Sequence, residues 1–162
     1  MSDARQRVAA ITLDERTVLR RSPAVEDERD AAVSDLLKDN RFAPASGRAG
    51  PFHLTLAIVE NRLVMEIRAL GDQPGGGSSE TTMLALTPFR RIIKDYFLVC
   101  ESHHAAIRGH GLAGVEAIDV GRRSLHDEGA ALLIERLAGK VAIDHATARR
   151  LFTLICVLHL RA

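Results

Sequence analysis

Apolar side chains recur at steps of three and four residues in the segment 87–108, which is the spacing of one face of an α-helix. Thr87 and Pro88 predict its start, because a threonine hydroxyl can cap a first turn and proline has the φ angle of a first helical residue. The apolar stripe consists of Phe89, Ile92, Ile93, Tyr96, Phe97, Cys100 and Ile107. We expect this helix to be the central packing element of the fold, with its stripe in the core.

Alternating apolar and polar residues upstream of this helix predict β-strands with one buried face. Phe52–Val59 and residues 63–68 alternate on either side of Glu60 and Asn61, so they are expected to form a hairpin. Asn61 tolerates the positive φ angle that a tight turn needs. A third strand is expected at residues 80–86, directly before the central helix.

Other segments have weaker or different patterns. Val8–Leu13 alternates weakly and is expected to be a first strand, at an edge of the sheet. The segments 41–50 and 71–79 are rich in glycine and proline, which predicts loops, the second of them flexible. Taken together, the strand segments predict a small antiparallel sheet of three to four strands in meander order.

Three more helices are expected. Ser22 and Pro23 repeat the cap and proline of a helix start, and Asn40 can end that helix in a left-handed conformation. Gly114 to about Ala138 is expected to form one long helix, or two joined at a glycine. A short strand at 139–143 should follow, and Asp144 should then cap a last helix.

The last helix is apolar on nearly every side between Leu151 and Leu160, so we expect neighbouring elements or a second subunit to bury it. The whole chain is therefore predicted to be a single α+β domain over residues 1–162. In it, the sheet packs against a C-terminal half of three helices, with one further helix near the N-terminus.

Composition narrows the class of protein. The chain has 22 lysine and arginine residues against 21 aspartate and glutamate residues, a net charge of +1, which predicts neither a nucleic-acid partner nor a membrane partner. The basic residues Arg90, Arg91 and Lys94, with Arg149 and Arg150, are more typical of a solvated surface. Two cysteines in apolar runs and no apolar N-terminal segment predict a cytoplasmic location.

Three stretches resemble a numbered family of alphaproteobacterial proteins. They are residues 88–97 (PFRRIIKDYF), residues 116–119 (EAID) together with residues 121–123 (GRR), and residues 148–156 (ARRLFTLIC). On these motifs the chain resembles uncharacterised protein family 0262. The resemblance implies a bacterial protein and transfers no catalytic residue, because no activity is assigned to that family.

A polar ridge interrupts the apolar side of the long helix at Asp119, Arg122 and His126, which are spaced i, i+3 and i+7. Charged groups on a buried face need partners. The ridge is expected either to form internal ion pairs or to line a pocket, and Lys94, Asp95 or Tyr96 of the central helix could join it as ligand-binding residues. Gly129 lies on the same stripe and would let another backbone come close.

A metal site is a further alternative. Cys100 and His104 are four residues apart and Cys156 and His159 are three apart, so two helices could together supply four ligands to zinc. Buried cysteines are more often small apolar residues of a core. We expect no metal and no cofactor.

Two hypotheses for function follow. The first is a small binding or regulatory protein without catalysis of its own, forming a homodimer through its helical half or binding a protein partner there. The alternative is a small anion-binding protein or enzyme that uses Asp119, Arg122 and His126 as an acid–base and anion site. The two differ in whether the ridge opens into a pocket.

Overall fold

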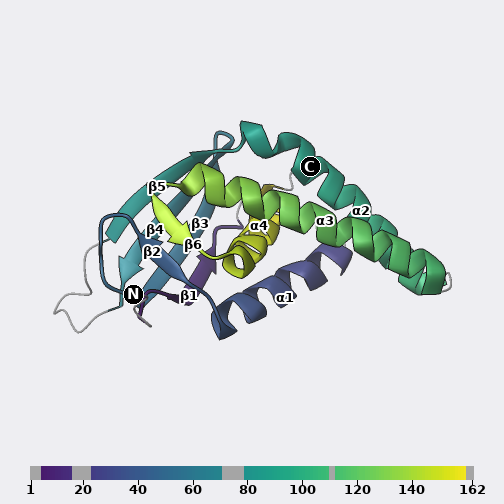
Figure 1. Ribbon diagram of the computed structural model, residues 1–162, viewed down its shortest axis with the longest axis horizontal. Helices are drawn as coiled ribbons and strands as arrows, with labels where there is room; N and C mark the ends of the chain where they lie inside the picture. Colours follow the sequence, from purple (N-terminus) through teal and green to yellow (C-terminus); the bar gives the residue numbers. More distant parts are fainter. Residues whose placement is uncertain (1–4, 16–22, 71–78, 110–111, 160–162) are drawn as a thin grey trace.

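The protein is an α+β structure in which helices cover one face of a small sheet (Figure 1). The computed structural model describes residues 5–15, 23–70, 79–109 and 112–159, with the side chains of residue 100, 102–109 and 112–118 outside the description. The elements in chain order are β1 (Val8–Leu13), α1 (Pro23–Lys38), β2 (Phe42–Pro44), β3 (Phe52–Val59), β4 (Arg62–Ala69), β5 (Ser79–Ala85), the 3₁₀ turn η1 (Thr87–Phe89), α2 (Arg90–Gly109), α3 (Leu112–Leu137), β6 (Val141–Ile143) and α4 (His145–His159).

The main sheet has the strand order β1-β3-β4-β5, and β3, β4 and β5 form the predicted antiparallel meander. Alternation places its apolar side chains in rows on one face, with Leu54 opposite Ile67 and Leu56 opposite Met65. Glu60 and Asn61 form the tight turn between β3 and β4, both with positive φ, 51° and 59°. The hairpin prediction is therefore confirmed.

The expectation of a wholly antiparallel sheet was wrong, because β1 is an edge strand that pairs with β3 in parallel. The chain passes through α1 between these strands, which gives it the length to return and run in the same direction. Alternation in Val8–Leu13 indicates which side of the strand is buried. It does not indicate the direction of the neighbouring strand.

A second, two-stranded sheet lies outside the prediction. The segment 41–50 was expected to be a loop, but Phe42–Pro44 forms β2 and pairs antiparallel with β6. The prediction failed there because three residues are too few to show a periodicity and their partner lies about a hundred residues later in the chain. The predicted short strand at 139–143 is confirmed as β6. Of the expected loop 71–79, residues 71–78 lie outside the described residues and Ser79 begins β5.

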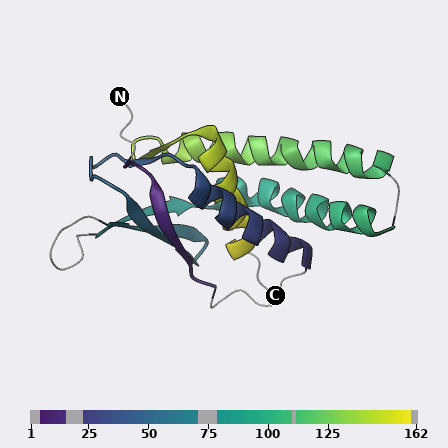
Figure 2. The ribbon, with the colours of Figure 1, turned by 90° about the horizontal axis from the view of Figure 1, so that it is seen from below.

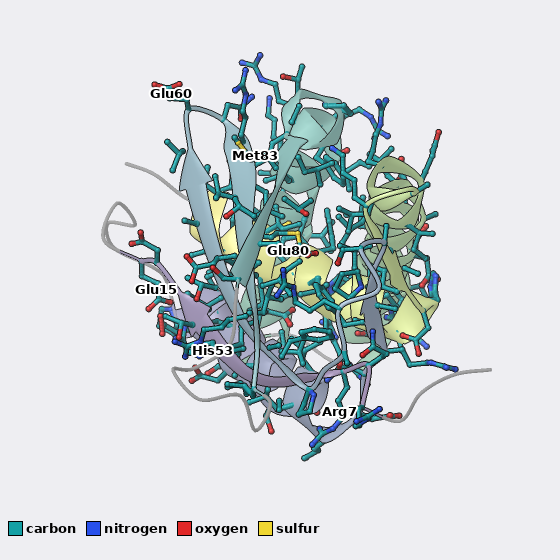
Figure 3. All side chains as sticks on the ribbon, turned by 90° about the vertical axis from the view of Figure 1, so that its left-hand side faces the viewer. Arg7, Glu15, His53, Glu60, Glu80 and Met83 are labelled. Carbon is teal, nitrogen blue, oxygen red and sulfur yellow. The ribbon has the colours of Figure 1, made fainter. Side chains whose placement is uncertain are left out.

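The outer face of the main sheet faces the viewer in Figure 3, with the helices behind it. His53 lies on this face, where its Nε2 is 2.7 Å from the Thr12 hydroxyl and its Nδ1 is 3.3 Å from an Arg68 guanidinium nitrogen. Met83 is also exposed there. The helices therefore bury only the opposite face of the sheet.

The central helix α2 follows the predicted pattern, with a different start. Thr87 and Pro88 belong to the 3₁₀ turn η1, and no side chain caps it; the Thr87 hydroxyl instead accepts a hydrogen bond from Asn61 Nδ2 at 3.3 Å. Tyr96 is completely buried and Phe97 partly buried, so the core stripe is confirmed where its side chains are described.

Asn40 does not end α1 in a left-handed conformation, because its φ angle is not among the positive values of the described residues. Its buried side chain instead joins α1 to β1. The Val8 amide donates to Asn40 Oδ1 at 2.7 Å, and Asn40 Nδ2 donates to the Val8 and Leu36 carbonyls at 2.9 and 2.7 Å. The Asn40 side chain thus satisfies one backbone N–H and two backbone carbonyls.

The C-terminal half consists of one long hairpin and one buried helix. The segment from Gly114 forms a single helix, α3, which lies beside α2 in both views (Figures 1 and 2). At Gly129 the close neighbour is the ring of Phe152, where a backbone was expected.

Asp144 caps α4 by accepting a hydrogen bond from the Thr147 amide at 2.9 Å, as predicted. Residues Leu151 to Leu158 of α4 are all buried, and α4 packs on α1, α3 and β3 of the same chain. The apolar sides of α4 are therefore satisfied without a second subunit, and the predicted homodimer has lost the feature that favoured it. In the described parts of the chain, no helix is long and apolar enough to pass through a membrane.

Candidate functional site

A polar groove of about 440 Å³ lies between the helices α1, α3 and α4. Each contributes one stripe of residues at helical spacing. The lining residues are Glu28, Ala31, Ala32 and Asp35 from α1, Asp119, Arg122, Arg123 and His126 from α3, and Ala146, Arg149, Arg150 and Thr153 from α4. The predicted ridge therefore lies in a groove, and α1 and α4 form the rest of its wall.

Arg122 connects two of these helices. Its Nη1 donates to Glu28 Oε1 of α1 at 2.8 Å, and its Nη2 donates to Asp119 Oδ1 on its own helix at 3.2 Å. Burial lowers the pKa of Arg122, but the charges of Glu28 and Asp119 outweigh it and hold this pKa above its ordinary value. Arg122 is therefore a permanent cation, and part of the ridge is an internal ion pair.

His126 forms the floor of the groove and is only 8% exposed. Burial and the nearby charges of Arg122 and Arg149 lower its pKa from 6.5 to about 4 against the weaker opposing effect of Asp127 and Asp119. The Thr153 hydroxyl lies 3.3 Å from His126 Nε2 and gives its proton to the Arg149 carbonyl at 3.1 Å. Nε2–H of a neutral His126 is therefore the donor to Thr153.

Two consecutive arginines of α4 enter the groove from the other side. Arg149 Nε lies 3.4 Å from Asp127 Oδ1, a carboxylate that also contacts His145 Nε2 at 3.1 Å. Arg150 donates from Nη1 to the Asp39 carbonyl at the end of α1, at 2.8 Å. A guanidinium has five N–H donors, so both arginines keep donors for a further acceptor.

Two buried donors of the groove make no hydrogen bond within the described structure. They are the Nε–H groups of Arg122 and Arg149, and the second lies near Asp127 without hydrogen-bond geometry. Buried N–H groups nearly always have a hydrogen-bond acceptor, so such a pair on one groove is unusual. The two arginines lie beside the neutral His126. Together these residues form a concave, positively charged surface that can bind hydrogen-bond acceptors from outside the chain.

The three candidate ligand-binding residues on α2 differ in their position relative to the groove. Lys94 is exposed and Asp95 forms an ion pair with Arg91 at 3.1 Å, and neither lines the groove. Tyr96 lies under it, with its ring centroid 5.3 Å from that of His126. Tyr96 therefore supports the floor of the groove and does not form its surface.

The metal alternative is described in part. Cys156 is a buried thiol, and His159 Nε2 lies 3.3 Å from Asn61 Oδ1. The side chains of Cys100 and His104 lie outside the described residues. Among the residues that are described, no three histidine, cysteine or acidic side chains gather in a group that could hold a metal ion.

Comparison with known sequences gives the family. The Uncharacterised protein family (UPF0262) matches residues 5–161. The chain belongs to this family. A UPF0262 protein of Rhodospirillum rubrum is 57% identical over 151 residues, which is 93% of this chain and 91% of the relative. Relatives of the same name from Nitrobacter winogradskyi and Chelativorans are 52% and 50% identical, covering 97% and 99% of this chain and 92% and 97% of their own length.

No solved structure matches this UPF0262 chain. The family has no assigned function, so membership confirms the resemblance found in the sequence and brings no activity with it. A function for the UPF0262 groove must therefore be argued from its own residues.

Sequence reasoning missed the α1 and α4 sides of the UPF0262 groove. Glu28 and Asp35 belong to one helical stripe with Ala31 and Ala32, and a search for acidic residues at i and i+7 would have found them. Arg149 and Arg150 were noticed only as a basic point. The local sequence pattern does not indicate that the acidic pair of α1 or the arginine pair of α4 approaches Arg122.

Proposed function

We propose that this protein is a binding protein without catalysis of its own, and that its groove between α1, α3 and α4 holds a small molecule with an anionic group. The observation that supports this most directly is the pair of buried Nε–H groups of Arg122 and Arg149, which make no hydrogen bond within the described residues. Carboxylate and phosphate oxygens are the acceptors that guanidinium groups bind best.

The charges around the groove favour an anion. Four arginines line it against three carboxylates, and two of these carboxylates, Glu28 and Asp119, already contact Arg122. Arg149 lies close to the Asp127 carboxylate, whereas Arg150 contacts the Asp39 carbonyl and has no acidic partner among the described residues, so it adds positive charge from α4. A ligand anion would thus meet guanidinium groups that are not fully neutralised.

The size of the groove supports a small-molecule ligand. About 440 Å³ lies within the range of 300–1,000 Å³ that is typical of small-molecule sites. Its polar, charged lining suits a charged metabolite better than an apolar one.

Proton transfer by His126 has little support. An imidazole with a pKa of about 4 is already neutral at pH 7, so it cannot act as a general acid there, and it is a weak base. Its Nε2–H also contacts Thr153. We assign His126 an uncharged role at the bottom of the groove. The proposal therefore includes no acid–base catalysis by this residue.

We also propose a cytoplasmic location. Cys156 is a buried thiol of the core, as is usual in a reducing compartment. A protein partner or second subunit on the helical half remains a separate prediction.

Isothermal titration calorimetry with inorganic phosphate, at constant ionic strength, tests the anion site. Phosphate should bind the wild-type protein saturably, and Arg149→Ala should weaken it by about tenfold or more, since a charge-assisted contact contributes on the order of 1.5–3 kcal/mol. Arg136→Ala is the matched control, because Arg136 is exposed on α3 outside the groove. Equal binding by all three proteins would contradict the proposal.

A further inference from the structure

The groove has one carboxylate that the anion proposal does not use. Asp35 lines the groove from α1, is exposed to solvent, and makes no side-chain ion pair or hydrogen bond within the described structure. The other two carboxylates of the lining, Glu28 and Asp119, are engaged by Arg122. Asp35 is therefore the acidic group that a ligand would meet with its charge available.

Asp35 lies at a different place along the groove from the ion pair of Arg122 and Glu28. Glu28 meets Arg122, and Asp35 lies seven residues, or about two turns, further along α1, which corresponds to roughly 10 Å of helix. Asp35 is four residues before Asp39, whose carbonyl receives Arg150. The buried Nε–H groups of Arg122 and Arg149 lie on α3 and α4. If the anionic group of a ligand binds those donors, another part of the same ligand can lie near Asp35.

A purely anionic ligand would be repelled by Asp35, which has no guanidinium of the described residues within ion-pair distance to offset its charge. A ligand with an amine near Asp35 would instead gain a charge-assisted hydrogen bond. The C-terminal end of a helix, where Asp35 lies, also favours a positive charge.

We propose that the ligand is zwitterionic: its carboxylate or phosphate binds Arg122 and Arg149, and its amine binds Asp35. The chemical class is that of amino acids and amino-phosphates with several bonds between the two charged groups. This inference rests on the anion site proposed above and adds the second determinant of specificity.

A matched set of six-carbon probes tests the inference. Hexanoate carries the anion alone, 6-aminohexanoate carries both charges, and 1,6-diaminohexane carries amines alone. Dissociation constants are measured by calorimetry for the wild type, Asp35→Asn and the control Asp39→Asn, whose side chain lies outside the groove lining.

The wild type should bind 6-aminohexanoate about tenfold more tightly than hexanoate, as expected for one charge-assisted contact in a partly enclosed site. Asp35→Asn should remove that preference without weakening hexanoate, and Asp39→Asn should keep it. The diamine should show no measurable binding to any of the three proteins.

Three results would overturn the inference. Equal binding of hexanoate and 6-aminohexanoate by the wild type, with Arg149→Ala still weakening both, would remove the amine contact and leave the anion site in place. A preference that persists in Asp35→Asn would show that the amine binds elsewhere. If no probe and no phosphate binds, the anion site fails together with the inference.

Discussion

The ring of Phe152 lies so close to Gly129 that a Cβ at position 129 would stand 2.6 Å from three of its ring carbons. Phe152 is completely buried on α4, and Gly129 is buried on α3. The glycine therefore sets how closely α4, with Arg149 and Thr153, approaches the α3 side of the groove.

Gly129→Ala should destabilise the protein. Alanine is the better helix former by about 1 kcal/mol, but its methyl group would push the rigid Phe152 ring into a packed core, which typically costs about 1–3 kcal/mol or more. We expect a net loss of about 1 kcal/mol in the free energy of unfolding, measured by urea denaturation.

Gly121→Ala is the matched control on the same helix. A Cβ at position 121 meets nothing within 4 Å, so only the gain in helix propensity remains. This variant should be up to about 1 kcal/mol more stable than the wild type. If both substitutions stabilise equally, the close contact between Gly129 and Phe152 is wrong.

Asn40→Ala should loosen β1 from α1. The substitution removes three hydrogen bonds and leaves the buried Val8 amide without its acceptor. The expected loss of stability is about 2–3 kcal/mol, since an unsatisfied buried group alone costs about 1–3 kcal/mol. Hydrogen exchange should report faster exchange of the Val8 amide. Asp39→Ala next to it should change stability by less than about 0.5 kcal/mol, and a similar loss in both would contradict this role of Asn40.

His126 should make stability depend on pH. Folding lowers its pKa from 6.5 to about 4, so the unfolded chain takes up a proton at a higher pH than the folded protein does. Its contribution is fully present above pH 6.5, is lost as the pH falls from 6.5 to about 4, and changes no further below that. The loss is about 3 kcal/mol at most.

The comparison with His126→Gln isolates this residue from other groups that take up protons as the pH falls. Asp127 does so below this range, because His145 and Arg149 hold its pKa below its ordinary value. The difference in unfolding free energy between the two proteins should shrink between pH 6.5 and 4. A difference that stays constant over that range would mean that His126 is not buried beside Arg122 and Arg149.

The ion pair between Arg122 and Glu28 should be worth more than an exposed one. Both side chains are mostly buried, 22% and 18% exposed, and they join α1 to α3. A double-mutant cycle with Arg122→Met and Glu28→Gln should give a coupling free energy of about 1–2 kcal/mol. The exposed pair Arg91 and Asp95 should give a much smaller coupling in the same experiment, because water screens it. Equal coupling free energies for the two pairs would contradict the role of Arg122 and Glu28 in joining α1 to α3.

The parts of the fold that follow from local periodicity could be predicted. The stripe of α2 indicated that Tyr96 is buried, and the alternation around Asn61 indicated the β3–β4 hairpin. The direction of β1 and the pairing of β2 with β6 depend on contacts between distant segments. A local pattern carries no information about them.

The candidate site shows the same limit. Asp119, Arg122 and His126 share one face because one helix fixes their spacing, so helical periodicity alone was enough to group them correctly. Asp35 and Arg149 reach the groove only through the packing of α1 and α4. The pocket, as distinct from the ridge, therefore could not be derived from the sequence.

The most direct test of the anion site is the nuclear magnetic resonance spectrum of arginine Nε–Hε groups during addition of inorganic phosphate at constant ionic strength. The signals of Arg122 and Arg149 should move saturably, because their buried Nε–H groups gain an acceptor, while that of the exposed Arg136 should stay in place. Unmoved signals for Arg122 and Arg149, or an equal and unsaturable shift of all three, would contradict the anion site.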